Sequence, residues 1–286
     1  MERIALIGFG EAGQAFAGGW RGVARGYDIK LDRPEDAEAK CADFARFGID
    51  AAGSTGDAID EASLILSLVT AEQAEAATDE AATHIPPGAL FCDMNSIAPD
   101  TKRRNAQVIE AAGGRYVDVA VMAPVHPQQV AVPLLVSGPH ADAAAAALID
   151  AGFSRVRVVP GDVGRASAIK MIRSVMVKGL EALTTECVLA ANAAGVLEEV
   201  VASLNASWPG TDWAYKADYN LNRMMIHGLR RAAEMEEVVK TLNALGTGSM
   251  MTRGTVECQR AIGRLGVASP PDRLEPKIAT LAERTA

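Results

Sequence analysis

The first 160 residues alternate short apolar runs with segments that carry apolar residues at helical spacing. The runs have the length of strands, and glycine and proline interrupt the chain between elements. One run, ASLILSLV at residues 62–69, is apolar throughout, as expected of a central parallel strand that is covered on both faces. We predict strands at residues 3–7, 27–31, 49–51, 62–69, 89–93, 115–118, 134–137 and 155–159.

The helical segments lie between these strands. They include residues 34–47, 71–84 and 141–151, a short helix capped by Ser54 and a helix that starts after Pro99. After Val163 strand-like alternation stops, and long apolar-periodic segments begin with residues 167–194. Glycine and proline divide this second half into about five helices. The pattern therefore predicts an α/β domain with a parallel sheet at residues 1–160 and an all-α domain at residues 161–286.

A glycine-rich turn follows the first strand in RIALIGFGEAG, residues 3–13. Gly8 permits a tight turn, Gly10 lets the backbone approach a pyrophosphate, and Gly13 lets the next helix lie close to the strand. An ordinary strand-to-helix turn is the alternative, because glycine is common in turns. Strand, helix and a following acid together favour a dinucleotide-binding, Rossmann-type domain. We assign the whole turn to the cofactor: Gly8, Phe9, Gly10, Glu11, Ala12 and Gly13.

An aspartate at the end of the predicted second strand suggests which nucleotide binds. Asp32 lies 24 residues after Gly8 and is expected to accept hydrogen bonds from the adenosine ribose hydroxyls. Its charge would repel a 2′-phosphate, so we expect NAD, while neighbouring Arg33 offsets part of that charge and leaves NADP open. Further cofactor contacts are expected at Leu68, Val69, Thr70 and Asn95.

Composition and charge limit the classes of molecule that we expect this protein to bind. With 286 residues and 49% hydrophobic content the chain is long enough for two domains. A formal net charge of −8 offers no basic surface for nucleic acid or an anionic membrane, so we expect neither as a partner. The four cysteines form no CxxC pair, and no export signal or bilayer-length apolar run is present, so we expect reduced thiols in a cytoplasmic protein. No cluster of ligating residues suggests a metal site.

A lysine and a hydroxyl lie together at the start of the helical half, in GDVGRASAIKMIRS. Lys170 and Ser174 are one helical turn apart and share a face. Hydride transfer from a carbinol carbon needs a group that takes the hydroxyl proton, and a partly desolvated lysine can do so. By composition alone a solvated surface lysine is the commoner alternative. We expect the substrate site in the cleft between the two domains, where this segment lies.

The motifs resemble those of the β-hydroxyacid dehydrogenase family, which includes 3-hydroxyisobutyrate and 6-phosphogluconate dehydrogenases, over nearly the whole chain. IGFGEAG is similar to the cofactor fingerprint of that family, and CDMNSIAPDT at residues 92–101, with Ser96, is similar to its segment beside the nicotinamide. VDVAVMAPV at residues 117–125 takes the place of its substrate-binding loop. GDVGRASAIK resembles the segment that ends in its catalytic lysine. The resemblance therefore implies that Lys170 is the catalytic lysine.

Two departures from the family pattern concern substrate. The family loop usually has a serine and two glycines where this chain has Met122, Ala123 and Pro124, and its usual asparagine one turn after the lysine is Ser174 here. Both changes remove carboxylate-binding groups or reshape the loop that presents them. We therefore expect a divergent branch whose substrate is bulkier or less acidic than a short hydroxy acid.

Other polar and aromatic residues are weaker candidates. His227 is expected to share a helix face with Arg230 and Arg231 and is assigned to substrate, with a structural histidine as the equal alternative. His126 lies in the loop after Pro124, where solvation is the commoner state. An aromatic cluster is expected to pack in the core, with a pocket or subunit contact as alternatives: Trp208, Trp213, Tyr215 and Tyr219.

The sequence thus predicts an NAD(P)-dependent oxidoreductase that moves a hydride between nicotinamide and the carbinol carbon of a hydroxy acid or related alcohol. Lys170 is its expected general acid/base. Two alternatives stay open: an imine reductase on the same fold, and a non-catalytic NAD(P)H-binding sensor. The long apolar segment at residues 169–194 predicts a homodimer or higher homo-oligomer.

Overall fold

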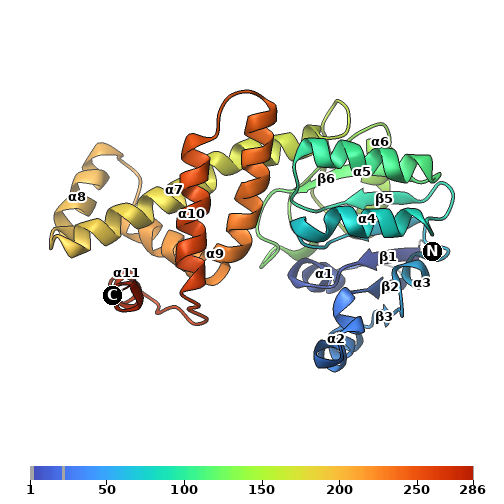
Figure 1. Cartoon of the computed structure of the whole chain (residues 1–286), viewed down its shortest axis with the longest axis horizontal. Coiled ribbons are helices and arrows are strands. Elements are labelled where there is room, and N and C mark those ends of the chain that lie inside the picture. The colour runs from blue at the N-terminus through green and yellow to red at the C-terminus, as the bar shows by residue number, and fades with distance from the viewer. Residues whose placement is uncertain (1–2, 21–22, 286) are drawn as a thin grey trace. The chain divides into compact units, whose positions relative to one another are not determined.

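The computed structural model of the chain describes residues 3–20 and 23–285. The chain divides into two compact units, Met1–Lys170 and Met171–Ala286. In Figure 1 the first unit, blue through green, holds a sheet flanked by helices, and the second, yellow to red, is helical. The predicted order, an α/β region followed by an all-helical region, is therefore confirmed.

The first unit is built on an eight-stranded sheet in the order β3-β2-β1-β4-β5-β6-β7-β8. The strands are β1 (Arg3–Ile7), β2 (Val23–Tyr27), β3 (Asp50–Ala51), β4 (Leu64–Ser67), β5 (Leu90–Asp93), β6 (Arg115–Val121), β7 (Leu134–Ser137) and β8 (Val156–Val158). Adjacent strands are parallel except β6 and β7, which are antiparallel. The predicted parallel sheet is therefore confirmed for the other pairs, and β6 and β7 run antiparallel because no crossover α-helix separates these two strands.

Helices cover both faces of this sheet. They are α1 (Glu11–Ala17), α2 (Pro34–Arg46), α3 (Thr55–Ile59), α4 (Ala74–Ala82), α5 (Pro99–Ala111) and α6 (Ala141–Asp150). Phe16, Phe44 and Leu148 bring α1, α2 and α6 into one core cluster. Ile59 and Ile109 belong to a second cluster, with α3, α4 and α5. Because both faces are covered, alternate residues of β1 enter opposite clusters, which explains its uninterrupted apolar sequence.

The predicted second strand at residues 27–31 is wrong. β2 ends at Tyr27, and the 3₁₀ helix η1 (Ile29–Asp32) follows. The register with β1 stops at the pair Ile7 and Tyr27, so no partner strand remains for the residues beyond. Apolar and polar residues alternate from Tyr27 to Leu31, and this sequence pattern imitates a strand. In the structure Leu31 packs on the core, whereas Ile29 is exposed.

Smaller differences concern the ends of elements. The run at residues 62–69 contributes a strand only at Leu64–Ser67, and the predicted helix at residues 71–84 consists of a short 3₁₀ helix, η2 (Ala71–Gln73), and α4. Another 3₁₀ helix, η3 (Gln129–Ala131), lies in the loop before β7. Ser54 caps α3 as predicted, with its Oγ accepting from the Asp57 N–H at 3.1 Å.

The second unit consists of helices from α7 (Arg165–Ala193), whose first turns belong to the first unit, through α8 (Leu197–Ser207), α9 (Trp213–Ala244), α10 (Met250–Arg264) and α11 (Leu274–Thr285). These are the five helices that the glycine and proline pattern indicates. α9 and α10 cross closely at Gly228 and Gly263, since a Cβ on Gly228 would lie 2.5 Å from the Gln259 carbonyl oxygen. In the described part of the chain, the helices lack the combination of length and apolarity that a bilayer span requires.

Candidate functional site

The glycine turn lies where the strand order of the sheet reverses, because β1 pairs with β2 on one side and β4 on the other. Ligands of open α/β sheets bind at the carboxyl ends of the strands at such a point. Gly8 has φ of +90°, and its N–H donates to the Tyr27 carbonyl oxygen at 2.8 Å. A Cβ here would lie 2.8 Å from the Leu68 carbonyl oxygen, so the turn requires glycine.

The other two glycines have the surroundings that a dinucleotide needs. A Cβ on Gly13 would lie 3.0 Å from the Phe9 ring. Glycine at this position therefore lets α1 lie close to the end of β1. Gly10 is exposed, and no atom lies within 4 Å of the place of its missing Cβ. Open backbone at this glycine leaves room for a pyrophosphate, so the turn fits the nucleotide that the motif predicts.

Phe9 holds the turn from within the core. Its ring is buried and stacks on Phe44, with ring centroids 4.2 Å apart. Its N–H donates to Asp28 Oδ2 at 2.7 Å, and its carbonyl oxygen accepts from Lys40 Nζ at 3.0 Å. Both backbone groups of Phe9 are therefore engaged within the protein, which makes it a structural support of the predicted cofactor site.

Asp28 is the acid that directly follows β2. It lies 20 residues after Gly8 (28 − 8 = 20), and its carboxylate contacts the glycine turn through the Phe9 N–H. The ribose-binding acid of a dinucleotide domain occupies this position, at the end of the second strand. Sequence reasoning missed Asp28 because it continued the strand past Tyr27; a spacing of about 20 residues from the first glycine was the available signal.

Asp32 does not end a strand, so the structural reason for assigning it to the ribose is wrong. It is exposed on η1, and its Oδ2 accepts from the Tyr27 hydroxyl at 2.5 Å. Burial, and next the hydrogen bond to Asp32, raise the pKa of Tyr27, so this hydroxyl remains a donor at physiological pH. Arg33 is exposed as well, and its guanidinium lies 3.9 Å from Asp36.

Leu68, Val69 and Thr70 follow β4 beside the glycine turn. The Leu68 N–H donates to the Ile7 carbonyl oxygen at 2.8 Å, and a Cβ on Gly8 would come within 3.0 Å of the Val69 side chain. Exposure increases along this segment, from half-buried Leu68 and Val69 to exposed Thr70. The three predicted residues thus form one side of the open turn.

Asn95 and Ser96 follow β5, the next strand along the sheet. Asn95 is buried, and its Nδ2 donates to Ser67 Oγ at 2.9 Å. Its Oδ1 is buried without a hydrogen-bond partner among the described residues. A buried acceptor in this state is costly, and it is typical of a site that a ligand donor completes.

The first unit brings two predicted residues into direct contact. Lys170, in α7, donates from Nζ to Ser96 Oγ at 2.6 Å. Both side chains are half-buried. The lysine is therefore neither a freely solvated charge nor sealed in the core, and its partner Ser96 is the residue that follows Asn95 in the loop.

The loop after β6 carries Met122, Ala123 and Pro124. The Met122 N–H donates to the Pro133 carbonyl oxygen at 2.9 Å, and Met122 packs against an apolar cluster that includes Leu135. Met122 and Ala123 are half-buried, whereas Pro124 is exposed. An apolar side chain thus occupies the position where the family pattern has a serine.

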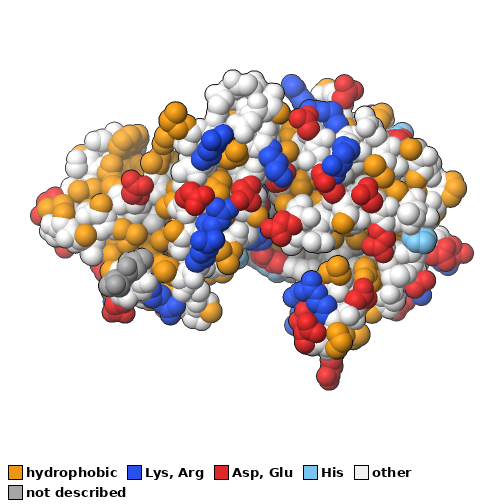
Figure 2. All heavy atoms as spheres, in the orientation of Figure 1, with side chains coloured by type: hydrophobic (Ala, Val, Ile, Leu, Met, Phe, Trp, Pro, Cys, Tyr) orange, Lys and Arg blue, Asp and Glu red, His pale blue; other side chains and the backbone are white. Residues whose placement is uncertain are grey.

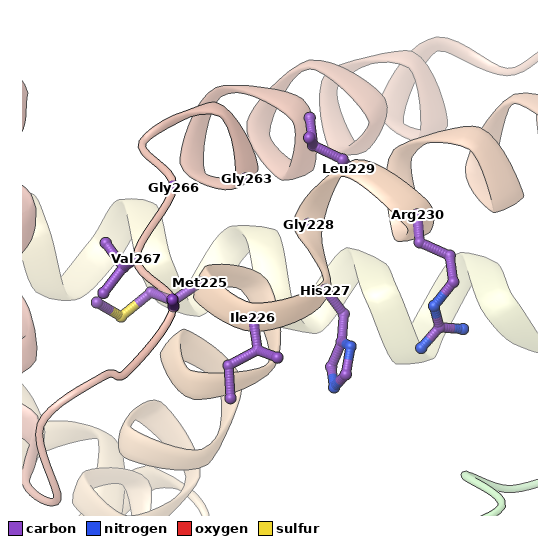
Figure 3. A pocket seen from close by; sticks show the side chains of 10 residues that line it. Met225, Ile226, His227, Gly228, Leu229, Arg230, Gly263, Gly266 and Val267 are labelled. Atoms are coloured by element: carbon purple, nitrogen blue, oxygen red, sulfur yellow. The ribbon is translucent and has the colours of Figure 1, made fainter. Parts of the chain in front are cut away.

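Ser174 and His227 belong to the second unit. Ser174 is buried, and its Oγ accepts from Lys178 Nζ at 3.3 Å; that ammonium also pairs with Glu234 at 2.9 Å. His227 lines a pocket near the crossing of α9 and α10. Figure 3 shows the side chains of His227 and Arg230 on the same side of α9, as the sequence predicts.

Three further polar residues have structural or solvated positions. Arg231 is buried against Glu181, with 2.6 Å between Nη1 and the carboxylate. His126 is exposed, and His140 Nε2 lies 3.1 Å from the Glu110 carboxylate. In the described part of the chain, no group of acidic, histidine and cysteine side chains is arranged to hold a metal ion.

The cysteines are free thiols, as predicted. Cys41 is exposed, Cys187 and Cys258 are half-buried, and Cys92 is buried. Burial raises the pKa of the Cys92 thiol to about 12, so it stays protonated near neutral pH. Cys92 therefore behaves as a small apolar residue of β5.

The expected core packing of the aromatic cluster in the second unit is wrong. Trp208, Tyr215 and Tyr219 are 54%, 70% and 47% exposed. Trp208 packs on Trp213 edge to face, with ring centroids 5.7 Å apart, at the turn between α8 and α9. The prediction fails because a cluster of aromatic residues in the sequence does not show which elements cover it.

Comparison with known proteins finds a matching family in each part of the chain. Residues 3–152 match the family described as the NAD binding domain of 6-phosphogluconate dehydrogenase, and residues 191–262 match a domain of unknown function (DUF1932). A conserved hypothetical protein from Sinorhizobium meliloti 1021 is 37% identical over 99% of this chain and 97% of that one, with a TM-score of 0.76. The first unit is thus an NAD(P)-binding domain.

Two further solved structures extend the likeness. A conserved protein of unknown function, described as structurally similar to 3-hydroxyacid dehydrogenases, is 29% identical over 91% of this chain and 99% of that one, with a TM-score of 0.67. The 3-hydroxyisobutyrate dehydrogenase of Mycobacterium tuberculosis is 18% identical over 98% of this chain and 99% of that one, with a TM-score of 0.75, and so shares the fold. The chain therefore belongs to the family defined by the NAD-binding domain of 6-phosphogluconate dehydrogenase, to which its β-hydroxyacid dehydrogenase motifs point.

Proposed function

We propose that the protein is an NAD(P)-dependent oxidoreductase that interconverts a carbinol and a carbonyl, with Lys170 as the general acid/base. The contact between Lys170 Nζ and Ser96 Oγ, at 2.6 Å, carries this proposal. It holds a proton-transferring group beside the loop of Asn95, in a domain whose family binds NAD(P). When bound, the nicotinamide supplies or accepts the hydride.

Lys170 and Ser96 have different roles in the proton transfer. In the direction of oxidation the uncharged amine of Lys170 takes the hydroxyl proton as the carbinol becomes a carbonyl; in reduction the ammonium returns that proton to the forming alkoxide oxygen. Ser96 Oγ accepts one N–H of Lys170, so the remaining hydrogens or lone pair of the amine stay available to the substrate oxygen. Asn95 Oδ1, the unsatisfied acceptor, is suited to the carboxamide of the nicotinamide.

The substrate loop indicates a less acidic partner than a short hydroxy acid. Met122 replaces a hydroxyl with an apolar side chain that packs on the Leu135 cluster, and Pro124 has no N–H to donate to a carboxylate. Both changes leave fewer donors for a carboxylate. A ketone or alcohol with an apolar body therefore suits this loop better.

A spectrophotometric screen tests the proposed function. Reduced nicotinamide is followed in the presence of hydroxy acids, alcohols, ketones and cyclic imines, with NAD(H) and NADP(H) in turn. Turnover of a carbinol or carbonyl compound supports the proposal. Consumption of reduced cofactor by imines alone indicates an imine reductase, and tight NADH binding without any turnover indicates a sensor.

The position of Asp28 predicts how nucleotide affinity is distributed. Asp28→Asn should weaken NADH binding about tenfold or more, because a hydrogen bond to a charged group contributes about 1.5–3 kcal/mol. The variant keeps an oxygen that can accept from the Phe9 N–H, so the turn should survive. Titration calorimetry with NADH measures the change.

Asp32→Asn is the matched control for that prediction. Its NADH affinity should stay within about twofold of the parent, because Asp32 is exposed on η1 and lies beyond the strand end. If Asp32→Asn lost more NADH affinity than Asp28→Asn, the ribose contact would be assigned to Asp32 instead. We also expect kcat/KM with NAD to exceed that with NADP, because the Asp28 charge opposes a 2′-phosphate.

We further propose that the helical unit forms the contact of a homodimer. Apart from Ile29 and Ile149, the large hydrophobic side chains that are exposed among the described residues belong to this unit. On α7, Ile172, Met176 and Leu183 are 49%, 64% and 53% exposed at spacings that share one helix face. Figure 2 shows hydrophobic side chains gathered over α7 and α8. We propose a second copy of this chain as its partner, because exposed apolar patches mark interaction sites and homodimers are the commonest oligomers.

Light scattering tests the dimer. The parent should have at least twice the 29.9 kDa mass of one chain at micromolar concentration. Met176→Glu places a charge on the exposed face and should lower the mass toward one chain without loss of helicity, because the side chain is not part of a core. Glu38→Lys, a charge change at an exposed residue of α2 in the first unit, is the control and should leave the mass unchanged. A parent of one-chain mass would exclude the proposal.

A further inference from the structure

A lysine is completely buried in the first unit. Lys102, on α5, has 0% exposure and lies between Asp93 at the end of β5 and Asp118 in β6, both also at 0%. Its Nζ is 3.0 Å from Asp93 Oδ1 and 3.6 Å from Asp118 Oδ1. Lysine is almost never fully buried unless it is paired. The ammonium therefore joins two carboxylates that belong to neighbouring strands.

Asp118 connects the start of α7 to the sheet through hydrogen bonds. Its Oδ2 accepts from the N–H groups of Gly164 at 3.1 Å and Ser167 at 3.0 Å, and from the Ser167 hydroxyl at 2.9 Å. Ser137, in β7, donates from Oγ to the same oxygen at 3.1 Å and accepts from the Ala166 N–H at 3.0 Å. The first N–H groups of a helix have no partner within the helix, so these side chains fix where α7 begins.

Asp93 holds the loop after β5 through hydrogen bonds. Its Oδ1 accepts from the Asn95 N–H at 3.0 Å, and its Oδ2 accepts from the Tyr116 hydroxyl at 2.7 Å. Its carbonyl oxygen accepts from Lys102 Nζ at 2.5 Å. Burial raises the pKa of Tyr116 well above its usual value, so that hydroxyl remains a donor. The loop that carries Ser96 is thus bound to the same ammonium as the start of α7.

We propose that Lys102, Asp93, Asp118 and Ser137 are positioning residues that set the contact between Lys170 and Ser96. Lys170 lies one helical turn after the fastened Ala166 N–H, and Ser96 lies three residues after Asp93. One buried ion network therefore holds both partners of the 2.6 Å hydrogen bond. This inference rests on the proposed role of Lys170. Reaction rates are sensitive to displacements of about 1 Å, which gives the network a catalytic consequence.

Ser137→Ala tests the network without removing a charge. It deletes the acceptor of the Ala166 N–H and one donor to Asp118. Competitive labelling with acetic anhydride, read by mass spectrometry, compares modification of Lys170 with that of the exposed Lys30. We expect Lys170 labelling to rise about threefold or more relative to Lys30, because the start of α7 opens more often and releases the amine from Ser96. NADH affinity should stay within about twofold, since the glycine turn is untouched.

Thr78→Val is the matched control. It deletes another buried hydroxyl of the first unit, whose Oγ donates to the Ala74 carbonyl oxygen within α4, and it should leave Lys170 labelling unchanged. Asp118→Asn is a second variant, expected to raise labelling at least as much as Ser137→Ala. If Ser137→Ala, still folded, labels Lys170 at the rate of the Thr78→Val control, the network does not position the lysine.

Turnover separates this inference from the proposed function. With the compound that the parent turns over fastest in the screen, kcat of Ser137→Ala should fall about 10- to 100-fold. A raised labelling rate with unchanged kcat, together with full activity of Lys170→Met, would remove the proposed role of Lys170 and the catalytic consequence with it. Inactive Lys170→Met with unchanged labelling and kcat in Ser137→Ala would reject only the positioning network.

Discussion

Replacing Lys170 by Met should lower turnover by about 10²- to 10⁴-fold, the usual consequence of losing a general acid/base. Methionine keeps an unbranched stem and a high helix propensity, so α7 should persist. The lost group is the ammonium that donates to Ser96 Oγ. NADH affinity should change little, because the glycine turn and Asp28 lie on other elements of the sheet.

Steady-state kinetics with the compound found in the screen measure this effect. Ser174→Ala should reduce kcat less than Lys170→Met, because the buried Ser174 hydroxyl accepts from Lys178 Nζ within the second unit. Lys30→Met, at an exposed lysine, is the matched control and should retain parental activity. If folded Lys170→Met turned over within about threefold of the parent, another acid would be required, and His227 would be the next residue to test.

Replacing Lys102 by Met should lower the free energy of unfolding by about 3–5 kcal/mol, because it leaves two buried carboxylates without their ammonium. Asp93 and Asp118 are both fully buried, and water cannot replace the lost charge without opening the core. Asp118 would keep its N–H donors from α7, which limits the loss. The expected effect is large against the stability of an ordinary domain, about 5–15 kcal/mol.

Urea unfolding followed by circular dichroism measures this change. Arg104→Met is the matched control, since Arg104 is on the same helix but forms an exposed ion pair with Glu75. That variant should lose about 1 kcal/mol or less. Equal losses for the two variants would show that the buried ammonium contributes no more than a surface charge.

The features that the sequence predicted are those that depend on local physics. The turn at Gly8 demands a left-handed residue, and the apolar run around Leu64–Ser67 is a strand buried on both faces; both follow from neighbours along the chain. The end of β2 cannot be predicted from neighbours along the chain, because only the pairing of β2 with β1 makes Tyr27 the last residue of the strand. One misplaced strand end placed the expected ribose acid at Asp32, whereas Asp28 is the acid that directly follows β2.

The buried network was outside the reach of sequence reasoning for a similar reason. A lysine in the helix that follows Pro99 is ordinarily a surface residue, and nothing near Lys102 in the sequence indicates that two strands place Asp93 and Asp118 beside it. The contact of Lys170 with Ser96 joins residues 74 positions apart. Family resemblance suggested both residues, but only the fold shows that they touch.

Deuterium transfer tests the central claim most directly. The protein is incubated with NADH or NADPH deuterated at nicotinamide C4 and with each carbonyl compound of the screen, and every compound is analysed by mass spectrometry. We predict that at least one carbonyl compound gains one deuterium at its former carbonyl carbon, and that this gain falls at least about 100-fold with Lys170→Met. Binding of reduced cofactor without deuterium transfer to any of these compounds would contradict the assignment of the protein as a carbinol oxidoreductase.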